Sequence, residues 1–140
     1  MNNFPTEAIA PTNITDTNVP LLKEYAWDFE KDKIILDKNG KFIIVEGIEA
    51  LKVRNYLSLR IYKGRFFIYK NKVGTKLKDL IGKSRSYVSL YVEEMLYEAI
   101  VDNVYVTDIE NLEISYVNDK VFVTFDVINI YKNYNEQIIL

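Results

Sequence analysis

Apolar residues recur at helical spacing in two segments of the chain. The clearer segment runs from Ser86 to about Val101. Ser86 is the predicted N-cap, because a serine side chain can accept a hydrogen bond from a free N–H group of the first helical turn. Its apolar stripe consists of Val88, Val92, Met95, Leu96 and Ala99. The other segment opens at Gly47 and ends near Gly64, which follows a basic last turn. We therefore expect two main helices.

A first β-hairpin is predicted between Lys33 and Glu46. Its two apolar arms flank Asn39-Gly40, a dipeptide that suits a two-residue type I′ turn because both turn positions need positive φ. Tyr25 to Phe29 is expected to add an earlier strand to the same sheet, and Arg65 to Tyr69 reads as a short aromatic strand. These segments predict an antiparallel arrangement in the first half of the chain.

A second hairpin is predicted in the last third of the chain, around a turn at Asn118-Asp119. A two-residue turn would place three pairs on one face: Tyr116 with Val121, Ile114 with Val123 and Leu112 with Phe125. Phe122, Ile128 and Ile130 fall on the opposite face, which is therefore partly apolar as well. Either helices cover both faces, or part of one face meets a partner.

The chain is expected to form one domain with a segment outside it at each end. Residues 1–22 contain all three prolines and show no periodicity, so they read as an extended N-terminal arm. Residues 23–132 form the predicted α+β domain, a small, mostly antiparallel sheet built from two hairpins and flanked by two main helices. Lys76 to Ile81 is expected to form a brief helical turn that ends at Gly82, and residues 133–140 a C-terminal tail.

The composition argues against most catalytic chemistry. The 140 residues include no cysteine and no histidine, which removes thiolate and imidazole catalysis and most transition-metal ligands. The net charge of −2 gives no electrostatic reason to expect nucleic acid or an anionic membrane surface as a partner. Eleven tyrosines fit either a Tyr-rich core or an interface. We expect a protein that is not an enzyme and holds no cofactor or metal.

Two motifs resemble functional sites only superficially. Gly82-Lys83-Ser84 matches the end of a phosphate-binding loop, but the glycine required five residues earlier is replaced by Leu77. Gly82 is better interpreted as the cap of the preceding helical turn. Glu94 and Glu98 lie one turn apart on the predicted helix, where neighbouring acids usually form a solvated stripe rather than a catalytic pair.

Several segments, in order, resemble the XkdS-like family of baseplate proteins of contractile phage tails and tail-like particles, which is related to the T-even sheath-initiating wedge protein. The resemblance covers roughly residues 24 to 131 and rests on the order and spacing of the segments. These segments are Tyr25-Ala26-Trp27-Asp28-Phe29-Glu30, Val45-Glu46-Gly47-Ile48-Glu49-Ala50-Leu51, Gly64-Arg65-Phe66-Phe67-Ile68-Tyr69, Val73-Gly74 and Leu80-Ile81-Gly82-Lys83. Asn103-Val104-Tyr105 stands where relatives often carry Asn-Pro-Tyr.

The resemblance implies a structural wedge subunit in a sixfold baseplate, assembled in the bacterial cytoplasm. Its implied partners are other wedge proteins, the sheath protein and the hub or tube proteins, with neither nucleic acid nor membrane. An exposed strand would accept a strand of the sheath through main-chain hydrogen bonds. The implied partner-binding residues are Gly64, Arg65 and Gly74 as a structural signature, Asn103 and Tyr105 as a wedge-contact turn, and Lys120, Phe122, Thr124, Asp126 and Ile128 on the strand near the sheath.

Three alternatives stay open at this point. A tail completion or terminator protein would bind the far end of the tube. A baseplate enzyme that acts on peptidoglycan would need a catalytic acid pair that the sequence does not display. A small binding module unrelated to tails would be encoded away from sheath and tube genes.

Overall fold

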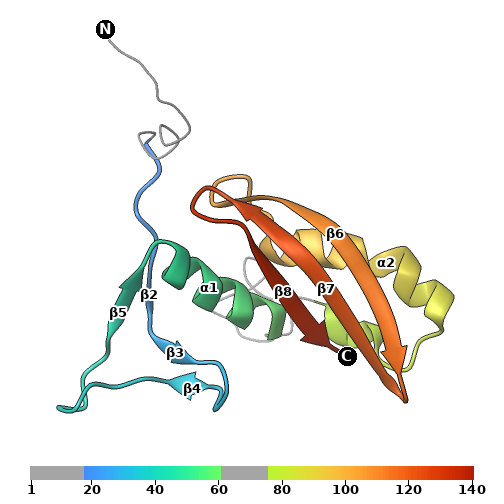
Figure 1. The fold of residues 1–140 in the computed structure, drawn as a ribbon, viewed down its shortest axis with the longest axis horizontal. Helices are drawn as coiled ribbons and strands as arrows, with labels where there is room; N and C mark the ends of the chain where they lie inside the picture. Colours follow the sequence, from blue (N-terminus) through green and yellow to red (C-terminus); the bar gives the residue numbers. More distant parts are fainter. Residues whose placement is uncertain (1–17, 61–75) are drawn as a thin grey trace, which may run out of the picture.

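A computed structural model describes residues 18–60 and 76–140, and within them the chain has the predicted α+β fold (Figure 1). In chain order the elements are β2 (Lys23–Tyr25), β3 (Trp27–Asp28), β4 (Lys33–Ile34), β5 (Ile44–Glu46), α1 (Ile48–Arg60), the 3-10 turn η2 (Leu77–Leu80), α2 (Arg85–Ile100), β6 (Val106–Val117), β7 (Lys120–Asn129) and β8 (Tyr134–Ile139). The predicted strand at 65–69 lies outside the described residues.

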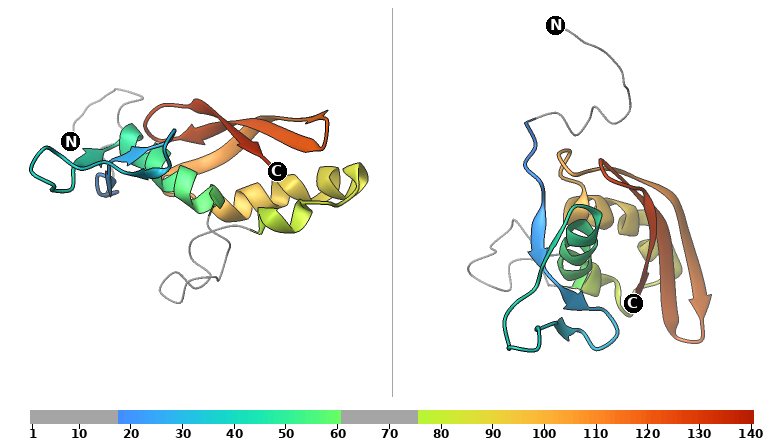
Figure 2. Two further views of the ribbon diagram at one scale, coloured as in Figure 1. Left: turned by 90° about the horizontal axis from the view of Figure 1, so that it is seen from below. Right: turned by 60° about the vertical axis from the view of Figure 1, so that its left-hand side comes forward.

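The body of the protein is a three-stranded antiparallel sheet in the order β6-β7-β8, with both helices on one face (Figure 2). The central strand β7 directs Val123, Phe125 and Val127 into the core, where each is fully buried. Alternate residues of a strand point to opposite faces, so the other half of β7 faces away from the helices. The core therefore lies between one face of the sheet and the helical layer, and neither described helix covers the second face.

The β6-β7 pairing confirms the predicted turn and corrects part of the register. Tyr116 lies opposite Val121 and Ile114 opposite Val123, as expected. Leu112 does not pair with Phe125, because the register shifts between Glu110 and Glu113. Asn111 has a left-handed φ of 55° there, and β6 contains one extra residue, so the inward positions of β6 shift by one residue between Ile109 and Leu112.

The last residues of the chain form a strand, and the predicted C-terminal tail at 133–140 is therefore wrong. β8 pairs antiparallel with β7 over its whole length, from Phe122 opposite Ile139 to Val127 opposite Tyr134. Ile138 is almost completely buried. Only every second residue faces the core and one of these is Glu136, so the apolar signal of this strand is weak in the sequence.

The two arms of the first predicted hairpin do not pair with each other as expected. Instead β5 pairs with β2 and β4 with β3, and the arms meet only in the single bridge between Leu36 and Phe42. The turn also differs from the predicted type I′ geometry. That geometry needs a positive φ at both Asn39 and Gly40, and only Gly40 has one, of 79°. The Asp37 carboxylate stabilises it by accepting the N–H groups of Asn39 and Lys41 at 2.8 and 2.9 Å.

Both helices begin within one residue of their predicted starts, although the N-cap of α2 differs from the predicted one. The predicted end of the first helix near Gly64 lies outside the described residues. α2 buries Val88, Val92, Leu96 and Ile100, which follow one another at four-residue spacing. Its N-cap is Ser84 and not Ser86, since the Ser84 hydroxyl accepts the N–H of Tyr87 at 3.2 Å. The predicted turn before it is confirmed as η2.

Residues 20–22, which were assigned to the N-terminal arm, are bound to the body of the protein. The Tyr105 hydroxyl donates to the Pro20 carbonyl at 2.6 Å, and the Leu22 N–H donates to the Tyr131 hydroxyl at 3.1 Å. The Leu22 carbonyl accepts the N–H of Gly47 at the start of α1. These contacts hold residues 20–22 against the domain.

Candidate partner-binding site

The residues predicted on β7 share one face of the sheet, the one turned away from the helices. They are Lys120, Phe122, Thr124, Asp126 and Ile128. However, β7 is the central strand, and its main chain is paired with β6 on one side and β8 on the other. A strand paired on both sides has no free N–H and C=O row to offer. β7 therefore cannot be the exposed strand that accepts a neighbour, and the edges of the described sheet are β6 and β8. The predicted position of the β7 residues near the sheath stays a prediction.

Asp126 illustrates how the outer face is organised. Its two carboxylate oxygens accept the side-chain amides of Asn135 on β8 at 3.0 Å and Asn111 on β6 at 2.8 Å. These two hydrogen bonds lower the pKa of Asp126, and the bond from Asn135 has the larger effect. Asp126 thus ties the three strands together, and its acceptor positions are used within the chain.

The outer edge of β8 is regular, and no strand within residues 18–60 and 76–140 pairs with it. Val121 and Leu140 exchange both main-chain hydrogen bonds, at 3.3 and 2.8 Å. Because hydrogen-bonded pairs alternate along an antiparallel ladder, residues 138, 136 and 134 direct their main-chain groups at β7. Asn135, Gln137 and Ile139 therefore direct theirs away from the sheet, along an edge that runs through the whole strand without a bulge.

The opposite edge, along β6, is less suited to pairing. The β6 ladder contains two irregularities, one between Val106 and Asp108 and one between Glu110 and Glu113. Bulges of this kind twist a strand and interrupt the regular row of main-chain groups, a common way of protecting an edge. β8 is thus the better candidate for a strand contact.

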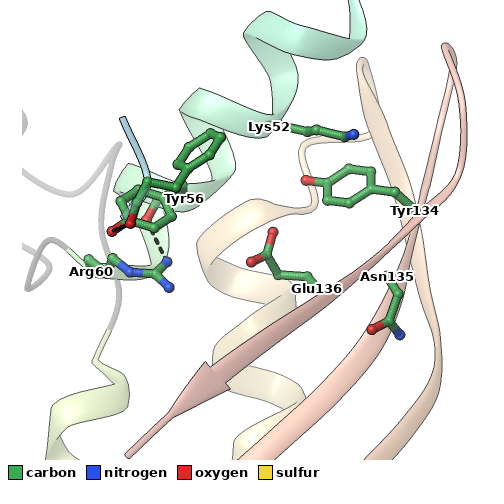
Figure 3. Close-up of a pocket in the computed structure, with 7 residues that line it drawn as sticks. Lys52, Tyr56, Arg60, Tyr134, Asn135 and Glu136 are labelled. Atoms are coloured by element: carbon green, nitrogen blue, oxygen red, sulfur yellow. Dashed lines mark hydrogen bonds between the residues drawn. The ribbon is translucent and has the colours of Figure 1, made fainter. Parts of the chain in front are cut away.

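A pocket of about 390 Å³ lies between β8 and α1, beside this free edge (Figure 3). Tyr134 and Glu136 contribute from the inner face of β8, and Lys52, Tyr56 and Arg60 from α1, while Phe29 closes it from the N-terminal segment. In Figure 3 the hydroxyl of Tyr134, the carboxyl of Glu136 and the cations of α1 converge on the pocket, whereas Asn135 points away from it. Tyr134 and Glu136, two residues apart on β8, therefore both face this pocket.

Two positively charged side chains of the pocket lining, Arg60 and Lys52, pack on aromatic rings. The Arg60 guanidinium lies 3.6 Å from the centroid of the Tyr56 ring and donates to the Tyr56 carbonyl at 3.1 Å. Lys52 Nζ lies 5.3 Å from the centroid of the Tyr134 ring. Such contacts hold a cation in place and leave most of its N–H donors available.

Burial shifts the pKa values of both ionisable groups that β8 contributes. Burial raises the pKa of Glu136, and the nearby Arg60 and Lys52 charges only partly oppose this. Burial likewise raises the pKa of Tyr134 to about 12, although the amide of Asn55 donates to its hydroxyl at 2.9 Å. Asn55 itself is fully buried, and its Oδ1 has no hydrogen-bond partner among the described residues. The Tyr134 hydroxyl is therefore neutral at ordinary pH and retains its own proton for donation.

The predicted wedge-contact turn is built around a residue that the sequence did not single out. The Asp102 carboxylate accepts the N–H groups of Val104, Tyr105 and Val106 at 2.9, 2.8 and 3.0 Å, and forms a 3.0 Å ion pair with Arg54 of α1. Partial burial alone would raise the pKa of Asp102, but the three N–H donors and Arg54 lower it overall. A helix end followed at once by aspartate and a new strand is the sequence signal that could have indicated this turn.

The two residues predicted for this turn differ in their availability. Asn103 is exposed and has a left-handed φ of 63°, so its side chain is accessible at the tip. Tyr105 is engaged internally, through its hydroxyl to Pro20, its ring to Tyr131 and the Arg54 guanidinium 5.3 Å from its centroid. The other predicted signature residues, Gly64, Arg65 and Gly74, lie outside the described residues.

Within residues 18–60 and 76–140, no group of three or more acidic, histidine or cysteine side chains is placed to hold a metal ion. No helix in the same described ranges is long and apolar enough to cross a membrane.

One comparison with known proteins identifies relatives of the chain. The model of the family described as contractile injection system sheath initiator matches residues 23–132. This match spans every described element except β8 and covers well over half of the chain. No curated protein matches it.

Proposed function

Because the chain belongs to the family of contractile injection system sheath initiators, we propose that it is a structural subunit of the baseplate that binds the first sheath ring by main-chain pairing along β8. The single observation that carries this proposal is the continuous free edge of β8, with the main-chain groups of Asn135, Gln137 and Ile139 directed outward. Extended segments bind such edges through main-chain hydrogen bonds, and pockets beside the edge select their side chains.

The proposed role is structural rather than catalytic, and the subunit occupies a sixfold baseplate around the tail tube. We assign its contacts with the other wedge proteins to the turn tip at Asn103 and Val104, the latter 44% exposed. The outer face of β7, with Phe122 and Ile128, is a second contact surface in this proposal. Assembly of the baseplate in the bacterial cytoplasm belongs to the same proposal.

A substitution at Gln137 tests the strand contact directly. Proline at this position removes an outward N–H while the residues that bond β7 keep theirs, and proline is tolerated on a strand edge whose N–H faces solvent. Baseplates carrying Gln137→Pro should assemble but lack sheath, as counted by electron microscopy of induced particles. Gln137→Thr, which keeps the N–H, is the matched control and should retain the sheath. Normal sheathing of the proline variant would refute the β8 contact.

The position in the particle is tested by quantitative mass spectrometry. The proposal expects a constant and low ratio of this subunit to the sheath, and retention with the baseplate after contraction. Absence of the subunit from purified particles would overturn the baseplate role altogether.

A further inference from the structure

The pocket beside β8 would receive a side chain of any strand that pairs with this edge. Residues directly opposite one another in neighbouring strands project from the same face of the sheet. Tyr134 and Glu136 project from the inner face of β8 into the pocket. A residue of the added strand that lies opposite Glu136 therefore also projects toward α1, into the same 390 Å³ space.

The groups around this space are mainly hydrogen-bond donors. The Tyr134 hydroxyl accepts from Asn55, so the proton of the hydroxyl is left for an acceptor in the pocket. Neither Lys52 nor Arg60 has a carboxylate within 4.0 Å among the described residues. Arg60 uses one N–H on the Tyr56 carbonyl, and its remaining N–H groups make no hydrogen bond to the described residues.

Acceptors in the described part of the pocket are fewer. Glu136 is the one acidic residue of the lining, and it makes no ion pair within 4.0 Å in the described ranges. Its carboxyl is half-buried; burial raises its pKa, and the charges of Arg60 and Lys52 partly oppose this. Asp32 lies nearby, but its Oδ1 already accepts the Tyr56 hydroxyl at 3.1 Å and the Trp27 indole N–H at 3.2 Å.

We propose that this pocket binds an acidic side chain, Asp or Glu, presented by the strand that adds to β8 at the position opposite Glu136. Its carboxylate would accept from Tyr134, Lys52 and Arg60, which stand on two sides of the space. The inference rests on the proposed function, because it names the chemistry that the same edge selects. Lys52 and Arg60 are then specificity-determining residues of the sheath contact, and a basic side chain at this register is rejected.

The test uses the full-length protein and the full-length sheath subunit encoded with it, with affinity measured in solution at low and at physiological salt. The double variant Lys52→Gln/Arg60→Gln should bind the sheath subunit at least tenfold more weakly. Lys132→Gln is the matched control: it removes a positive charge from the exposed loop between β7 and β8, outside the pocket, and should bind as the parent does. Urea unfolding of each variant shows whether the fold is retained.

A charge exchange gives the inference its decisive readout. Lys52→Glu/Arg60→Glu should abolish binding. Hydrogen exchange identifies the segment of the sheath subunit that binding protects, and each acidic residue of that segment is replaced by lysine in turn. One of these replacements should restore binding to the Lys52→Glu/Arg60→Glu protein. Unchanged or tighter binding by Lys52→Gln/Arg60→Gln would overturn the proposal that the pocket binds an acidic side chain. If Gln137→Pro still abolishes binding in that case, the strand contact stands and only the pocket inference fails. Binding unaffected by Gln137→Pro would instead overturn the proposed function on which the inference rests.

Discussion

Arg54 of α1 and Asp102, just beyond α2, form an ion pair with 3.0 Å between Nη1 and Oδ2. This contact joins the first helix to the turn that leads into the sheet. The same carboxylate caps three consecutive N–H groups, and the Arg54 guanidinium also packs on the Tyr105 ring, whose hydroxyl binds Pro20. Segments from the beginning, middle and end of the domain therefore meet at one point.

Asp102→Ala should destabilise the protein by about 1–2 kcal/mol, because it leaves three N–H groups without an acceptor and Arg54 without its partner. Asp102→Asn keeps one acceptor oxygen and should cost less. Urea unfolding at neutral pH provides the measurement. Glu94→Ala, at an exposed position of α2, is the control and should stay within about 0.5 kcal/mol of the parent. Equal losses of stability from Glu94→Ala and Asp102→Ala would contradict a stabilising role for the Asp102 hydrogen bonds and ion pair.

The two serines at the start of α2 should differ in their effect on stability. Ser84→Ala removes the acceptor for the Tyr87 N–H and should cost about 1 kcal/mol. Ser86→Ala lies inside the first helical turn, is exposed, and should change the free energy of unfolding by less than about 0.5 kcal/mol. Thermal and urea unfolding of the two variants decide which serine is the N-cap. A larger loss of stability from Ser86→Ala than from Ser84→Ala would favour Ser86, the cap expected from the sequence.

Stability should fall between pH 10 and pH 12 because of Tyr134. Its pKa is raised from 10.0 to about 12 in the folded protein, so its contribution is fully present below pH 10 and is lost as the pH rises through 12. A shift of two units corresponds to at most about 3 kcal/mol. Tyr134→Phe should flatten this part of the stability curve, while Tyr91→Phe on the surface of α2 should leave it unchanged. An identical alkaline slope in the Tyr134→Phe protein would argue against a buried hydroxyl.

Glu136 should make the free protein less stable at neutral pH than a neutral isostere would. Its pKa is raised by burial, so its favourable contribution is present below the unfolded-state pKa and is lost as the pH rises through the folded-state pKa. Glu136→Gln should therefore raise the urea midpoint at pH 7 and leave it unchanged at pH 3. Glu94→Gln, on the exposed face of α2, controls for the loss of a charge. Destabilisation at pH 7 would mean that attraction to Arg60 and Lys52 outweighs the cost of burial.

The local pattern of the sequence was sufficient for the helices and for one turn. The helical spacing of Val88, Val92, Met95, Leu96 and Ala99 predicted α2, and Asn118-Asp119 predicted the turn that pairs Tyr116 with Val121. The resemblance to baseplate proteins agrees with the family match. The predicted contacts of single residues with partners stay predictions.

Pairings between distant segments were not predictable in the same way. The arms that flank Asn39-Gly40 look like a self-contained hairpin, but each arm forms its main-chain hydrogen bonds with residues 23–28 and not with the other arm. The register of β6 before Glu113 could not be deduced either, because the alternating pattern does not reveal that Asn111 adopts a left-handed conformation. Local signals state which residues can turn or extend, and the partner is chosen by packing over the whole domain.

The candidate site shows the same division most clearly. The α+β class, the two helices and the lack of histidine and cysteine side chains could be read from the sequence alone. The folded chain was needed to show that β7 is central, that β8 lies at one edge of the described sheet, and that Glu136, Lys52 and Arg60 line one pocket. The physical reason is that burial repeats over a few residues leave a periodic trace in the chain, whereas a site assembled from α1 and β8 depends on contacts between residues about 80 positions apart, which no local pattern records.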